Sequence, residues 1–180
     1  SIIQYSIIEY GGGLYYDGST PYVDNCIIRY HSTHGIHHGA WANSSNPMKV
    51  TNSTINNNAG RGVQINGGNN ILNYAGIIID GNTISYNVGG IESPGYYATF
   101  SNNIITNNTV QGGIHCTECI ATNNLIINNS TDSDHEAGGI RIHGGTVTGN
   151  IIYNNTAKKG GGVSIRSGTV NLSNNFIVNN

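Results

Sequence analysis

The chain has 180 residues, of which 7 are Lys or Arg and 9 are Asp or Glu, so only 9% of the sequence is charged and the formal net charge is −2. The chain therefore has no basic face for nucleic-acid binding, and it has no apolar run of about 18 residues that would predict a membrane span. The 26 glycines and 29 asparagines are typical of low complexity or a repeat, and a hydrophobic content of 37%, much of it in Ile-Ile pairs, favours the repeat over disorder.

Three apolar positions recur in chain order from the first residues to the last. The phrase Gly-apolar-x-apolar occurs seven times, with its anchors at Leu14, Ile36, Val63, Ile91, Ile114, Ile140 and Val163. The phrase Asn-x-Ile-Ile-x-Asn-Asn and its variants have their central apolar residues at Ile8, Ile28, Ile55, Ile84, Ile105, Ile126, Ile152 and Ile177. Five residues upstream of these lie Ile3, Val23, Val50, Ile79, Phe100, Ala121, Val147 and Leu172. Each unit therefore predicts three short strands separated by Gly, Asn or Ser corners.

A unit of about 25 residues with three strands cannot bury its own apolar side, so the units are expected to stack and share one core. Stacked coils about 4.8 Å apart place equivalent residues above one another. Two asparagine columns follow from this, and they would form ladders at the corners. The first column is Asn57, Asn107, Asn128, Asn154 and Asn179, and the second is Asn58, Asn87, Asn108, Asn129, Asn155 and Asn180.

The Asn-x-Ile-Ile-x-Asn-Asn phrase followed by Gly-Gly-Ile resembles the repeat of the pectin-lyase-like superfamily, and the resemblance covers the whole chain. It implies an all-β, right-handed parallel β-helix, a solenoid of about seven coils of 20–29 residues with three short strands per coil. We expect residues 1–180 to form a single domain. Because no polar end caps are evident, we expect this domain to be a segment of a longer protein or to associate through its ends.

Alternation along the Gly-apolar strands places one residue per coil on the outer surface. This outward column is Tyr15, His37, Gln64, Glu92, His115, Arg141 and Ser164, and His143 belongs to a second column beside it. Enzymes of the superfamily act on such an outer groove. Glu92, His115, Arg141 and His143 are therefore the catalytic candidates, with Glu or His as a base and Arg neutralising a uronate carboxylate. The alternative is that outward positions simply take polar residues.

The superfamily includes polysaccharide lyases, glycoside hydrolases, uronate C5-epimerases, phage tailspikes and cell-surface repeat proteins. The Asp cluster of the hydrolases and the Asp-Pro-His run of the epimerases are missing, and Asp80 has no carboxylate neighbour in the sequence to make a lyase calcium site. We therefore favour an extracellular or cell-surface scaffold that binds carbohydrate or acts as an adhesin. The alternatives are a polysaccharide-processing enzyme and a building block of a filament or surface lattice. We expect the favoured scaffold to require no cofactor.

Three further features suggest sites. Trp41, the single Trp, lies in the extended corner 39–47 and would stack on a sugar ring beside the outward column, or equally cover the core. The acidic insert with Asp132, Asp134 and Glu136 would hold Ca²⁺ if its oxygens converged, although it lacks the EF-hand pattern. Cys116 and Cys119 either pack a corner as small apolar residues or form a disulfide.

Overall fold

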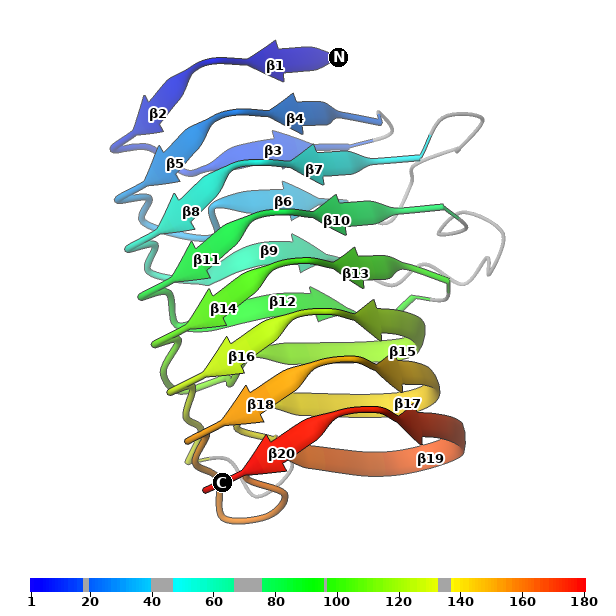
Figure 1. The fold of residues 1–180 in the computed structure, drawn as a ribbon. Helices are drawn as coiled ribbons and strands as arrows, with labels where there is room; N and C mark the ends of the chain where they lie inside the picture. The colour runs from blue at the N-terminus through cyan, green and yellow to red at the C-terminus, as the bar shows by residue number, and fades with distance from the viewer. Residues whose placement is uncertain (18–19, 40–46, 67–75, 96, 133–136) are drawn as a thin grey trace.

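The computed structural model describes residues 1–17, 20–39, 47–66, 76–95, 97–132 and 137–180. These segments form a parallel β-helix whose strands stack in layers from β1 to β20 (Figure 1). Within the described residues, the structure contains no helix with the length and apolar character that crossing a membrane requires.

The strands lie on three faces. The first face contains β1 (Ile2–Gln4), β4 (Tyr22–Asp24), β7 (Lys49–Thr51), β10 (Ile78–Asp80) and β13 (Thr99–Ser101). The second face is an eight-stranded sheet of β2 (Ile7–Glu9), β5 (Ile27–Arg29), β8 (Thr54–Asn56), β11 (Thr83–Ser85), β14 (Ile104–Thr106), β16 (Leu125–Ile127), β18 (Ile151–Tyr153) and β20 (Phe176–Val178) among the described residues. The third face begins with β3 (Leu14–Tyr16), β6 (Ile36–His38), β9 (Arg61–Ile65) and β12 (Gly89–Ser93).

The last three coils differ from the expected three short strands. There, β15 (Ile114–Thr122), β17 (Ile140–Thr148) and β19 (Val163–Ser173) each run across the third and first faces as one strand. Residues with positive φ bend these strands without ending the pairing: Glu118 (φ 47°) in β15, Gly144 (φ 76°) and Gly145 (φ 111°) in β17, and Gly168 (φ 73°) in β19. In earlier coils the same corner contains a longer connection, which separates the two strands.

All three predicted apolar columns are confirmed. Every pairing between the strands that the structure describes is parallel, and the partners match the columns read from the sequence, as in Ile84 with Ile55 and Ile105 on the second face. Ile91 pairs with Val63 and Ile114 on the third face. These side chains are buried in one continuous aliphatic core along the axis of the solenoid.

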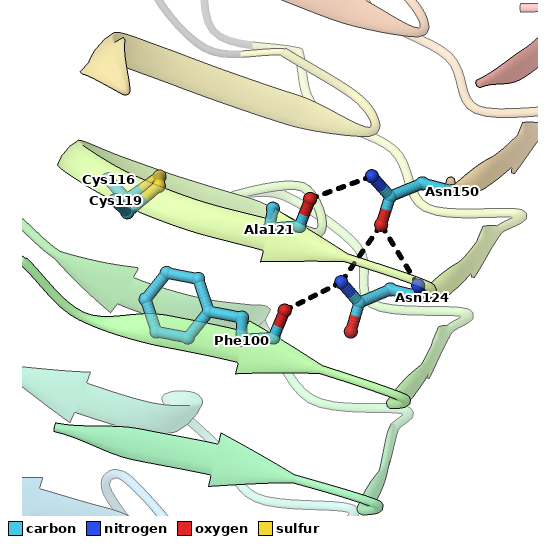
Figure 2. Close-up of a disulfide and its surroundings, with 6 residues drawn as sticks. All are labelled: Phe100, Cys116, Cys119, Ala121, Asn124 and Asn150. Carbon is cyan, nitrogen blue, oxygen red and sulfur yellow. Dashed lines mark hydrogen bonds between the residues drawn. A yellow bond between two sulfur atoms is a disulfide. The ribbon is translucent and has the colours of Figure 1, made fainter. Parts of the chain in front are cut away.

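Buried asparagines form ladders at two corners. The predicted ladder through Asn87, Asn108 and Asn129 is present: Oδ1 of Asn108 accepts hydrogen bonds from both the backbone N–H and Nδ2 of Asn87, at 3.1 Å each. A second ladder, which the sequence analysis did not identify, consists of Asn82, Asn103, Asn124, Asn150 and Asn175. In Figure 2, Asn124 donates to the Phe100 carbonyl and to Oδ1 of Asn150, both at 2.9 Å.

A disulfide joins Cys116 to Cys119 inside β15, and both side chains are fully buried (Figure 2). The disulfide alternative is therefore the correct one for this pair. Cys26 is a buried free thiol in another coil.

Candidate functional site

The outer surface of the third face displays the predicted polar column. Tyr15 pairs with His37, His37 with Gln64, and Gln64 with Glu92. The column continues through His115 and Arg141 to Ser164. Because the backbone register is strict, one side chain per coil points from the same strand position along the whole face.

The first half of the column is joined by ring and amide contacts. The Tyr15 and His37 rings meet edge-on with their centroids 5.0 Å apart, and His34 contacts His37 at 5.2 Å. The amide nitrogen of Asn66 lies 2.8 Å from Nε2 of His37. Burial, together with the nearby His37 and Arg61, lowers the pKa of His34. His38, the residue after His37 in β6, is buried at 1% exposed.

Glu92 is the centre of the charged part of the column. Its Oε2 lies 2.8 Å from Nε of Arg61 and its Oε1 lies 3.1 Å from Nδ1 of His115. Burial opposes ionisation of this carboxyl, but the hydrogen bond from His115, the charge of Arg61 and the hydrogen bond from Gln64 outweigh burial and lower its pKa to about 2. Glu92 is therefore ionised at neutral pH and held between two nitrogen groups.

Arg61 was missed by the sequence analysis because it lies at the start of β9, where alternation does not decide the direction of a side chain. Its side chain, which is 6% exposed, crosses the coil boundary over Gly89. A Cβ at Gly89 would lie 3.1 Å from both Cγ and Nη1 of Arg61, so the glycine provides the room that brings Arg61 to Glu92.

The four catalytic candidates are brought together in part. Glu92 contacts His115 directly, the His115 and His143 rings are 5.9 Å apart, and Arg141 pairs in register with His115. A register shift then places His143 opposite Ser167, whose Oγ lies 3.0 Å from Nδ1 of His143. The arrangement provides cationic and hydrogen-bonding groups along a line. A carboxylate with a pKa of about 2, already paired, is a weak general base at neutral pH.

The other predicted sites are not tested. Trp41, Asp134 and Glu136 lie outside the described residues. Asp132 is the last described residue before 133–136, and it is exposed. In the parts of the chain that the structure describes, no group of three or more His, Cys, Asp or Glu side chains is arranged to hold a metal ion.

Comparison with known protein families gives a match to this chain. A family model described as a right handed beta helix region matches residues 38–180. No curated protein and no solved structure matches the chain.

Proposed function

We propose that this chain, which belongs to the right handed β-helix family, is an extracellular or cell-surface scaffold that binds an extended polysaccharide along its third face. The observation that carries this proposal is the polar column itself, which repeats once per coil from Tyr15 to Ser164. A linear polymer whose units recur along its length is matched by a surface whose polar side chains also recur along its length.

The chemistry of the column favours an acidic polymer. Arg141 and His143 lie on one coil and His115 on the coil before it, so a guanidinium and two imidazole rings adjoin where a carboxylate of a uronate would lie. Tyr15 and His37 add ring faces and edges that suit the apolar side of a sugar. The proposed location is supported by the Cys116–Cys119 disulfide, since such bonds persist in oxidising compartments.

The test is retention of the purified chain in native gels that contain polygalacturonate, alginate or a neutral β-glucan. We expect the uronate polymers to retard the wild type. The variant Arg141→Ala should lose about tenfold in affinity, the equivalent of one charge-assisted hydrogen bond. Lys49→Ala is the matched control, because Lys49 is an exposed cation on the first face.

Two outcomes contradict the proposal. Equal mobility of the wild type in gels with and without each polymer overturns binding. Unsaturated sugar ends can be detected by ultraviolet absorbance after the chain is incubated with a uronate polymer. Their accumulation would show that the protein is a lyase and not a scaffold.

A further inference from the structure

A second surface feature lies at the corner that follows each strand of the second face, where the tips of β2, β5, β8 and β11 stack along one edge (Figure 1). The register of these strands aligns the corner residues Tyr10, Tyr30, Asn57 and Tyr86 on four successive coils. All four have left-handed backbone conformation, with φ of 57°, 60°, 54° and 55°. The corners of the following coils carry asparagine at the same position, for example Asn128.

Tyrosine is an unusual residue at this corner. Asparagine adopts left-handed φ with little strain, whereas a bulky side chain there is uncommon. Burial does not compensate the strain, because Tyr10 is 77% exposed and Tyr86 61% exposed. Three of the four corners therefore carry exposed rings that the fold itself does not need.

The first two rings show how this corner arranges aromatic groups. The Tyr10 and Tyr30 rings are stacked, with centroids 5.3 Å apart and planes 17° apart. Tyrosine rings at this corner on successive coils are therefore close enough to stack on each other. Tyr30 and Tyr86 are two steps apart, about 10 Å at a coil spacing of about 4.8 Å. The corner residue of the coil between them is the much shorter Asn57.

We propose that the space over Asn57, between Tyr30 and Tyr86, binds one pyranose ring of a saccharide. A ring midway between the two tyrosines would lie about 5 Å from each, which is the separation that aromatic stacking favours and that Tyr10 and Tyr30 already adopt. The neighbouring amides of Asn56 and Asn57, which hydrogen bond to each other at 3.2 Å, lie at the base of this space and suit sugar hydroxyl groups.

The charges beside the corner favour a saccharide over a quaternary ammonium ion, the other ligand that paired tyrosines recognise. The Arg29 guanidinium carbon lies 5.1 Å from the centroid of the Tyr30 ring, so this ring already has a cation next to it. The nearby carboxylate of Glu9 is taken up by Arg29, whose Nε donates to it at 2.7 Å. Arg29 would repel a second cation at this ring, but it would not repel a sugar ring, whose faces carry apolar C–H groups.

This site is separate from the polar column of the third face and does not depend on it. Saturation-transfer NMR with methyl β-glucoside, methyl β-galactoside and cellotetraose tests it, with choline as the competing probe. We expect transfer from tyrosine protons to the C–H protons of at least one saccharide.

Asn57→Tyr should abolish the transfer by filling the space with the residue that the neighbouring coils use. Tyr86→Asn should weaken binding about tenfold by removing one wall.

The control variants separate this proposal from the one above. Tyr5→Asn removes an exposed tyrosine (79% exposed) with the same left-handed φ at a different corner, and it should leave binding unchanged. Arg141→Ala should also leave it unchanged. Absence of transfer to every saccharide, undiminished binding by Asn57→Tyr, or binding of choline in place of the saccharides would each overturn the proposal.

Discussion

Asn129 and Asn155 are joined twice, because Oδ1 of Asn155 accepts hydrogen bonds from both the backbone N–H and Nδ2 of Asn129, at 3.0 Å each. Asn129 also donates from Nδ2 to the Ile105 carbonyl at 2.9 Å. Each amide in this ladder thus satisfies backbone groups at a corner that is closed to solvent. Buried polar groups without partners are costly, so the ladder allows a buried corner to exist.

Asn129→Ala should therefore destabilise the protein strongly. The substitution removes the acceptor of the Asn108 backbone N–H, one of the two acceptors of Asn108 Nδ2, and a donor to the Ile105 carbonyl in a buried corner. We expect a loss of about 2–4 kcal/mol in the free energy of unfolding, measured by urea denaturation. Asn123→Gly is the control. Asn123 is an exposed left-handed corner residue, and the next coil has Gly149 there, so a change below about 1 kcal/mol is expected.

Glycine in the Gly-apolar phrase is required by close packing of backbones from neighbouring coils. A Cβ at Gly90 would lie 2.1 Å from the carbonyl oxygen of Gly113 and 2.9 Å from Cγ2 of Ile105. Because the first contact is with backbone, it cannot be relieved by a rotamer change. Gly90→Ala should cost about 3 kcal/mol or more, or prevent folding. At Gly12 a Cβ meets nothing within 4 Å, so Gly12→Ala should leave the urea midpoint nearly unchanged.

The columns of the fold could be predicted because a solenoid converts sequence period directly into spatial register. Every coil repeats the same apolar positions, so aligning phrases in the sequence also aligned Ile55, Ile84 and Ile105 in space. The continuous strand β15 could not be predicted in this way. Its bend depends on one residue, Glu118 (φ 47°), whose type does not signal positive φ.

The candidate site was predictable in its backbone but not in its contacts. Alternation identified Glu92 and His115 as outward neighbours, and they are 3.1 Å apart. It did not identify Arg61, because that contact depends on a long side chain crossing over a glycine. The second asparagine ladder was missed because its column does not contain asparagine in every coil, and Ser53 takes that position in one of them. The Ser53 hydroxyl still accepts a hydrogen bond from the backbone N–H of Cys26, which lies at the same position one coil earlier.

The Cys116–Cys119 disulfide should contribute modestly to stability. It closes a loop with a sequence separation of 3, and so short a loop gives about 2 kcal/mol by restricting the unfolded chain. Replacing both residues by Ala should lower the free energy of unfolding by about this amount. Dithiothreitol should lower the urea midpoint of the wild type and leave that of the double variant unchanged. An equal effect of the reductant on both proteins would contradict this account.

Glu92 should make the stability of the protein depend on acid pH. Its pKa in the folded protein is lowered to about 2, and its pKa in the unfolded chain is near the ordinary value of about 4.3. Because the folded state favours the ionised carboxyl, the stabilisation is complete above about pH 4.3 and is lost as the pH falls toward 2. After allowance for solvent screening of a partly exposed group, we expect about 1–2 kcal/mol.

Comparison of the wild type with Glu92→Gln isolates this contribution from the other acidic groups. The variant keeps the shape of the side chain but leaves Arg61, which is 6% exposed, without its carboxylate. At pH 6 it should be less stable than the wild type by about 1–2 kcal/mol, and the difference should shrink progressively between pH 4 and pH 2. Glu9→Gln, at the more exposed pair with Arg29, should cost less than about 1 kcal/mol at pH 6. A difference between wild type and Glu92→Gln that stays constant from pH 6 to pH 2 would mean that Arg61 and His115 do not hold Glu92 in its ionised form.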